Sequence, residues 1–231
     1  MSEALPVIAI LGGTGDLGTG LARRWAQAGY HVIIGSRTMD KAQAAVTDLK
    51  AVMAERGIDS VNVIAMENLA AAEAADICAM TVPFAHQADT LARVKVALTG
   101  KILIDVTVPL VPPKVARVQL PEQGCAGQIA QNILGEDVNV VSAFQNVAAH
   151  HLQEGHGLSC DVIVCGDKKA AREQVITLVE AAGMRGFHGG SIANAAATEA
   201  LTSVLIFINK QYGCHAGIRI TGLEESPTTH D

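Results

Sequence analysis

The stretch VIAILGGTGDLG, residues 7–18, decides how the chain folds. Its apolar run at 7–11 predicts a short buried strand, and the segment 16–28 carries apolar residues at helical spacing. Between the two, Gly13, Gly15 and Gly18 match the pattern G-x-G-x-x-G. That spacing is typical of a tight turn at which the backbone and a helix N-terminus approach a pyrophosphate. We therefore predict a dinucleotide-binding strand, loop and helix. The alternative, a glycine turn without a ligand, fits this context less well.

Apolar segments continue to alternate with helical ones beyond this unit. We expect further strands at 31–35, 62–66, 76–82, 102–106 and 138–144, and a long helix at 39–55. Such alternation predicts βαβ units and a parallel sheet. The expected fold class is α/β, a Rossmann-type doubly wound parallel sheet over residues 1–146. Pro109, Pro112 and Pro113 interrupt the alternation after the carboxyl end of a strand, where such sheets bind ligands.

The pattern changes after residue 146, where we expect a small C-terminal α/β domain over residues 147–231. It should contain a loop at 148–159, a strand at 161–166 and an amphipathic helix at 168–182. The helical segment 191–212 is apolar on nearly every face, so it needs cover on all sides. We expect a second subunit to supply that cover. The sequence thus predicts a homodimer, which a charge at Leu205 should disrupt.

Composition narrows the class of protein. The net charge of −6 disfavours non-specific nucleic-acid binding, which requires a basic face. We expect no membrane span, and the N-terminus lacks the basic region of a signal peptide. Five cysteines without a CxxC pair are typical of buried, reduced thiols, so we expect a cytoplasmic protein.

The end of the second predicted strand indicates which nucleotide binds. NAD-binding Rossmann domains place an Asp or Glu there for the ribose 2′-hydroxyl. This chain has Gly35, Ser36 and Arg37, with Lys41 one turn later. A guanidinium that grips phosphate with two hydrogen bonds, a hydroxyl and a second cation favour a 2′-phosphate. We predict NADP. The alternative is that the two cations only begin a solvated helix, which the helix dipole disfavours without an anion.

The glycine motif also resembles that of the extended short-chain dehydrogenases. Those enzymes need a Tyr-x-x-x-Lys pair for proton transfer, and neither Tyr30 nor Tyr212 has a lysine four residues later. Their chemistry is therefore not expected. A non-catalytic NADP-binding regulator on such a fold stays open as an alternative.

A closer resemblance extends over nearly the whole chain. The blocks GGTGDLGTGLARRWAQAGYHVIIGSR (12–37), TVPFAH (81–86), SAFQNVAA (142–149), CDVIVCGD (160–167) and GIRITGL (217–223) resemble the NADPH-dependent coenzyme F420 reductases, also called F420-dependent NADP oxidoreductases. The resemblance implies hydride transfer between NADP(H) and the deazaflavin ring of coenzyme F420, which is a substrate. It also implies a Rossmann domain, a small C-terminal domain with the deazaflavin between the two, and a homodimer.

The resemblance assigns site residues to two groups. The NADP group comprises Thr14, Gly15, Asp16 and Leu17 at the pyrophosphate, Ser36, Arg37 and Lys41 at the 2′-phosphate, and Phe84 and Ala88 beside the nucleotide. The second group lies where the two rings should meet: Val108 on the nicotinamide side, Gln145, Val147 and Ala149 beyond the sixth strand, and Ala216 at the deazaflavin.

One position departs from the family pattern. Archaeal members have His where this chain has Gln145, and an amide can hydrogen-bond to a ring edge but cannot titrate. An NADP-dependent reductase with another acceptor, a flavin or a pterin one-carbon carrier, is therefore an alternative.

The sequence predicts no catalytic side chain and no metal site. Both reactants carry the hydride chemistry themselves, so no general base is required. His86 is interpreted as a residue that positions its loop; the alternative is that it faces the cleft. His150, His151 and His156 match no zinc spacing and are interpreted as loop residues.

Overall fold

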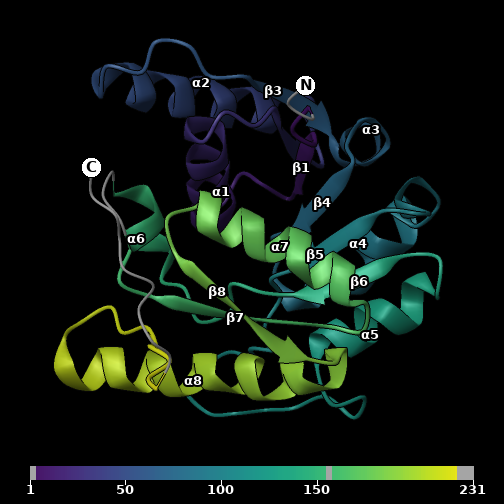
Figure 1. Ribbon diagram of the computed structural model, residues 1–231, viewed down its shortest axis with the longest axis vertical. Helices are drawn as coiled ribbons and strands as arrows, with labels where there is room; N and C mark the ends of the chain where they lie inside the picture. The colour runs from purple at the N-terminus through teal and green to yellow at the C-terminus, as the bar shows by residue number, and fades with distance from the viewer. Residues whose placement is uncertain (1–3, 155–157, 223–231) are drawn as a thin grey trace.

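All the strands in the described part of the chain join one sheet. The computed structural model describes residues 4–154 and 158–222, which contain eight strands in the order β3-β2-β1-β4-β5-β6-β7-β8 (Figure 1). Their bounds are Ile8–Leu11 (β1), Val32–Ser36 (β2), Val63–Glu67 (β3), Ile77–Met80 (β4), Ile102–Asp105 (β5), Asn139–Ser142 (β6), Asp161–Gly166 (β7) and Arg185–Gly190 (β8). The first six follow the Rossmann order, in which the chain reverses direction across the sheet between β1 and β4.

Helices cover both faces of the sheet. Their bounds are Asp16–Gln27 (α1), Met39–Glu55 (α2), Asn68–Ala74 (α3), Gln87–Val94 (α4), Ala126–Leu134 (α5), Ala149–Gln153 (α6), Lys169–Ala181 (α7) and Ala195–Tyr212 (α8), with short 3-10 turns at Phe84–His86 (η1), Val96–Leu98 (η2) and Ile192–Asn194 (η3). The core residues of α1, α2, α6 and α7 gather on one face, and those of α3, α4, α5 and the start of α8 gather on the other.

The strands are apolar on both sides because both faces are covered. In β1, Ile8 and Ile10 pack into one core cluster, whereas Ala9 and Leu11 pack into the other. All four are fully buried.

The predicted α/β fold class is confirmed, and the six predicted Rossmann strands all occur near their expected positions. The predicted loop at 148–159 is wrong in part, because residues 149–153 form α6. Residues 155–157, with His156 among them, lie outside the described part. The sequence analysis also missed α3, α5 and β8. The last strand, RGFHGG, has three glycines and no apolar alternation, so only its pairing with β7 identifies it.

The C-terminal part adds to the same sheet instead of forming a sheet of its own. Strand β7 runs antiparallel to β6, with Ser142 opposite Cys165, and β8 runs parallel to β7. One core cluster includes Trp25 from α1 and Leu178 from α7, and the Trp25 indole N–H donates to the Leu178 carbonyl at 2.8 Å. The expected boundary at residue 146 therefore does not separate two sheets or two cores.

Helix α8 differs from its expected environment. Together with η3 it is long and apolar enough to cross a membrane by length and composition, contrary to the expectation that no segment of the chain is. It is not buried on all sides either: Val204 is 45 % exposed and Phe207 is 58 % exposed. Leu205, in contrast, faces its own chain and is 7 % exposed. Figure 1 shows α8 along the side of the molecule that lies farthest from α2.

Candidate active site

The glycine loop joins β1 to α1 and is held from two sides. Gly12 has a left-handed φ of +72°, which favours glycine. Its N–H donates to Asn68 Oδ1 at 3.1 Å, and the N–H of Gly13 donates to the Gly35 carbonyl at 2.9 Å. The next strand and the start of α3 thus fix the loop before any ligand arrives.

Two of the motif glycines, Gly18 and Gly15, have different local surroundings. A Cβ on Gly18 would lie 2.7 Å from the Gly13 Cα, so only glycine allows α1 to pack this closely on the loop. A Cβ on Gly15 would meet no heavy atom within 4 Å. Gly15 is also the N-cap of α1, where no side chain satisfies the first backbone N–H groups. The loop therefore offers free donors and open space at one point.

A cavity of about 730 Å³ opens beside this loop. It lies at the carboxyl ends of β1, β2, β3 and β4, around the point at which the strand order reverses. Open α/β sheets bind their ligands at this point. Its lining residues are Gly12, Thr14, Gly15, Ser36, Arg37, Lys41, Glu67, Asn68, Leu69, Thr81, Val82, Pro83, His86, Asp89, Thr90, Arg93 and Val94.

Five of the predicted NADP residues line this cavity together: Thr14, Gly15, Ser36, Arg37 and Lys41. Ser36 ends β2 and is buried, whereas Arg37 and Lys41 are exposed. Neither cation forms an ion pair anywhere in residues 4–154 and 158–222. Thr38 caps α2 without a side-chain hydrogen bond, so a helix N-terminus adds its positive end to the two cations.

The other predicted nucleotide residues lie near the cavity but do not line it. Asp16 is exposed in the first turn of α1, and Leu17 packs half-buried against the core. Phe84 is half-buried in η1, and Ala88 is exposed on α4. The segment η1–α4 contributes to the lining through other side chains.

The sequence analysis missed several residues of the cavity wall. Asn68 secures the glycine loop, and its Oδ1 would lie 2.8 Å from a Cβ on Gly35, which explains the glycine in β2. Glu67 and Asp89 bring negative charge, and Arg93 brings a third cation. A signal existed for Asn68, because it is a polar residue two positions after a predicted strand, at the edge of the sheet where ligands bind.

The predicted acceptor residues form a second group, apart from the cavity lining. Gln145 is buried, and its Nε2 donates to the Asp105 carbonyl at 2.8 Å and to Ser142 Oγ at 2.7 Å. These bonds orient the amide, and its Oε1 has no hydrogen-bond partner within the described residues. Buried polar atoms without a partner are rare in folded proteins. Thr202 Oγ1 of α8 donates to the Gln145 carbonyl at 2.7 Å.

The remaining acceptor residues are half-buried: Val108, Val147, Ala149 and Ala216. The fold brings the last of these close to the others. Asn146 Nδ2 donates to the carbonyl of Asp161, at the start of β7, at 2.8 Å. The N–H of Asp161 in turn donates to the Ile218 carbonyl at 2.9 Å. The C-terminal segment therefore passes beside the segment that follows β6.

Two buried carboxyl groups lie next to the acceptor residues. Asp105, at the end of β5, accepts from Gln87 Nε2 at 2.6 Å and from the Thr107 N–H at 2.9 Å. Glu199 of α8 accepts from the N–H groups of Ala126 and Gly127, at 2.6 and 3.0 Å, at the start of α5. Burial raises the pKa of Asp105 to about 6 and that of Glu199 to about 7.

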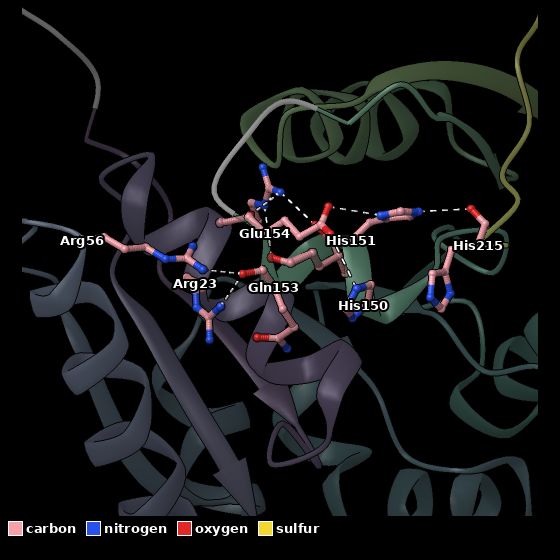
Figure 2. A network of polar contacts seen from close by, with 9 residues as sticks. Arg23, Arg56, His150, His151, Gln153, Glu154 and His215 are labelled. Carbon is pink, nitrogen blue, oxygen red and sulfur yellow. Dashed lines mark hydrogen bonds and ion pairs between the residues drawn. The ribbon is translucent and has the colours of Figure 1, made fainter.

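Two of the histidines predicted to lie in a loop, His150 and His151, instead lie in α6 and belong to a polar network around it (Figure 2). His151 bonds to Glu154 Oε2 at 3.3 Å through Nδ1 and to the His215 carbonyl at 3.1 Å through Nε2. The His150 and His215 rings lie 4.8 Å apart. No cluster with a metal-binding set of side chains occurs in the described ranges. His86 lines the cavity instead of only supporting its loop.

The thiols agree only in part with the expectation of buried cysteines. All five are free; Cys78, Cys125 and Cys165 are buried, Cys160 is half-buried, and Cys214 is exposed. Burial raises the pKa of Cys78 to about 12 and that of Cys165 to about 11, so these two are inert thiols of the core.

Comparisons with known proteins agree with this geometry. Residues 7–109 match the family model described as NADP oxidoreductase, coenzyme F420-dependent. The F420-dependent NADP reductase of Methanocaldococcus jannaschii is 39 % identical over 223 residues, which cover 94 % of this chain and 99 % of the relative. That of Methanothermobacter marburgensis is 40 % identical over 225 residues, with 94 % and 99 % covered.

A solved structure agrees as well. It is a candidate F420-dependent NADP reductase from Arthrobacter sp. FB24, with a TM-score of 0.75 and 25 % identity over 91 % of this chain and 96 % of that chain. Full-length similarity of this degree, together with the glycine loop and the cation pair, establishes the family. The chain belongs to the F420-dependent NADP oxidoreductases.

Proposed function

We propose that this protein transfers a hydride between NADP(H) and coenzyme F420. The observation that carries the proposal is the cavity at the ends of β1–β4, which combines a glycine loop with Arg37 and Lys41. The relatives that match almost the whole chain are named F420-dependent NADP reductases. Binding and chemistry are therefore assigned to the two groups of residues described above.

The residues of the cavity suit NADP. The open space at Gly15 and the uncapped start of α1 would receive the pyrophosphate. Ser36, Arg37 and Lys41 would hold the 2′-phosphate, with no carboxylate at the end of β2 to repel it. Asp16, Leu17, Phe84 and Ala88 belong to the same proposed site, although they lie outside the cavity lining.

The segment after β6 suits a ring with polar edges. Gln145 Oε1 is a buried acceptor whose orientation is set by two hydrogen bonds from Nε2, so it could accept from a ring N–H. Val147, Ala149 and Ala216 would supply apolar contacts around it, and Val108 would contact the nicotinamide side. The amide therefore replaces the binding role of a histidine at this position, but not a titrating one.

The contribution of the protein to the reaction is to position the two substrates. When bound, nicotinamide and deazaflavin supply the hydride chemistry themselves. Holding two reactants in the right orientation lowers a barrier by roughly 7–11 kcal/mol. No side chain of this chain is assigned as a general base. The buried amide and the half-buried apolar residues exclude water and define the ring plane.

We further propose that the protein works as a homodimer in the cytoplasm. The buried side of α8 carries Thr198, Glu199 and Ser203, whereas its apolar Val204 and Phe207 face outward. The long loop between β5 and α5 also carries exposed apolar residues. This loop contacts α8, since Ser203 Oγ donates to the Arg117 carbonyl at 3.4 Å. A second copy would cover this apolar surface.

The test of the function is direct. Purified protein is mixed with NADPH and coenzyme F420, and the visible absorbance of the deazaflavin is followed. We expect rapid bleaching with NADPH and at least tenfold slower bleaching with NADH. A flavin and a pterin carrier serve as competing acceptors in parallel reactions. Reduction of one of these without reduction of F420 would favour another NADP-dependent reductase, and no turnover with any acceptor would favour a regulator.

A further inference from the structure

Helix α1 contacts the nucleotide loop and also residues 144–154, the acceptor segment that follows β6. It begins at Asp16, directly after Gly15 beside the cavity, and it packs against α6 and, through Trp25, against Phe144. A Cβ on Gly20 would lie 2.6 Å from the Leu152 Cβ, so the two helices touch at backbone distance. Gln153 Nε2 donates to the Asp16 carbonyl at 2.7 Å, in the first turn of α1. One helix thus contacts both proposed substrate sites.

The start of the acceptor segment is braced by an aromatic pair. Phe144 directly precedes Gln145 and has a φ of +73°, a left-handed conformation that a bulky residue rarely adopts. Its ring lies edge-to-face on Trp25 of α1, with centroids 6.0 Å apart. Both side chains are fully buried. Such a conformation persists only where neighbouring groups hold it in place, and here the Trp25 ring of α1 does so.

The end of the acceptor segment is braced by three guanidinium groups (Figure 2). Arg24 donates to the carbonyls of Leu152 at 3.2 Å, His151 at 3.0 Å and Glu154 at 2.7 Å. Arg23 and Arg56 both donate to the Gln153 carbonyl, at 2.8 and 2.7 Å. The last carbonyls of α6 are thereby satisfied from α1 and from the end of α2.

This concentration of positive charge is unfavourable by itself. Arg23 and Arg24 are 7 % exposed. Burial lowers the pKa of both guanidinium groups, and the nearby Arg56 lowers it further. A short helix on the surface of a protein could end with water on its carbonyls. The arginines instead fix α6 at a defined position along α1.

We propose that Arg24, with Trp25 and Arg23, is a positioning residue for hydride transfer: it fixes residues 145–149 relative to the nucleotide loop through helix α1. The inference rests on the proposed function. In this proposal, the face of α1 that packs against α6 aligns the acceptor residues with the nucleotide loop. Residues 145–149 lie between the two braces, at Phe144 and at α6, so their position depends on both.

The experiment compares Arg24→Gln and Arg24→Lys with the wild type. Arg24→Gln should slow single-turnover hydride transfer from NADPH to F420 by about 10–100-fold, because small displacements of aligned reactants are costly. Its affinity for NADPH, measured by binding in the absence of F420, should stay within twofold. Arg24→Lys keeps one charged donor and should recover part of the rate. Amide hydrogen exchange of residues 145–151 should rise in Arg24→Gln without any ligand, while exchange of residues 12–18 stays unchanged.

The matched control is Arg172→Gln, which removes a guanidinium bonded to the Gly166 carbonyl, outside the acceptor segment. It should leave the single-turnover rate unchanged. If Arg24→Gln does not fold, Arg23→Gln, which removes a donor to the Gln153 carbonyl at the end of α6, takes its place with the same expectations.

A wild-type rate in the folded Arg24 variant, or equal slowing in the control, would overturn the inference. If the wild type itself does not reduce F420, the proposed function fails. In that case, unchanged hydrogen exchange of residues 145–151 in Arg24→Gln would show separately that Arg24 does not hold this segment in place.

Discussion

At the scale of single residues, we expect a few side chains at the end of β2 and the start of α2 to select the nucleotide. Arg37 and Lys41 line the cavity and form no ion pair with any residue that the structure describes, and Ser36 lines it at the end of β2. A carboxylate in their place would accept the 2′-hydroxyl of NAD and repel a phosphate. We therefore attribute the preference for NADP to two cations and one hydroxyl, and not to the shape of the fold.

Removal of the Arg37 guanidinium should weaken the binding of NADPH but not that of NADH. Arg37→Ala loses a charge-assisted pair to the 2′-phosphate, which contributes about 1.5–3 kcal/mol. We expect NADPH to bind roughly 10–150-fold more weakly, since 1.4 kcal/mol corresponds to tenfold, whereas NADH binding should change little. Titration calorimetry with both nucleotides measures this, with Lys50→Ala as a control for lost positive charge. Equal losses for the two nucleotides would contradict the assignment.

A side chain at the loop should exclude the pyrophosphate without unfolding the protein. Gly15 has φ −87° and ψ 171°, which any residue adopts, and its Cβ direction is open. Gly15→Val should therefore abolish NADPH binding, while the midpoint of thermal unfolding without ligand stays within a few degrees. Gly15→Ala should give an intermediate affinity. Full affinity in the valine variant would place the pyrophosphate elsewhere.

The buried Glu199 should make stability depend on pH. Its pKa is raised to about 7 by burial, so the folded state binds a proton more tightly than the unfolded chain. Its contribution is therefore most favourable below the unfolded pKa and is lost as pH rises through about 7.

Between pH 5.5 and 8.5, the free energy of unfolding of the wild type should fall by roughly 1–2 kcal/mol more than that of Glu199→Gln. Urea unfolding at both values measures the difference, and the exposed Glu122→Gln serves as the control. If Glu199→Gln keeps the full pH dependence, the titrating group lies elsewhere.

At the scale of elements, α8 buries polar side chains and exposes apolar ones, the reverse of the pattern in a core helix of a monomer. Its polar Thr198 and Glu199 are buried, where Glu199 accepts from a backbone N–H of α5 and Thr198 donates to a carbonyl of its own helix, and its apolar Val204 and Phe207 face outward. A sequence without coordinates cannot assign these faces, because the helix is apolar by composition all round. The residue that tests the proposed dimer is therefore Phe207 instead of Leu205.

Phe207→Glu should produce a folded monomer, because Phe207 is 58 % exposed and a charge there blocks only a partner. Leu205→Glu should lower stability instead, since Leu205 is 7 % exposed in its own chain. Light scattering at micromolar concentration distinguishes the two outcomes. Val96→Glu, at a residue 88 % exposed on η2, is the control for a new surface charge. A wild type that is already monomeric would refute the dimer.

At the scale of the whole molecule, both proposed substrate sites belong to one continuous sheet. The nucleotide cavity lies at β1–β4, and the acceptor segment follows β6, where the antiparallel β7 turns the chain back. Helix α1 packs on both regions. The two parts expected from the sequence thus share one core.

That shared core predicts how fragments behave. A chain cut after residue 146 loses Leu178 and the rest of α7, which cover Trp25 in the intact protein. We expect residues 1–146 alone to be poorly soluble and to show no cooperative unfolding by circular dichroism. Co-expression with residues 147–231 should restore NADPH binding. A stable, NADPH-binding fragment 1–146 would instead support two independent domains.

Local chemistry determined much of this protein from its sequence alone. The α/β class, the glycine loop and the cations after β2 each depend on residues within a few positions of one another, so periodicity and motif spacing identify them. Only the tertiary structure decided the rest. Pairing identifies β8, the exposed face of α8 depends on what covers its other face, and Asn68 and Arg24 act on backbone groups 56 and about 130 residues away. Such contacts leave no local pattern, because their partners are main-chain atoms that every residue carries.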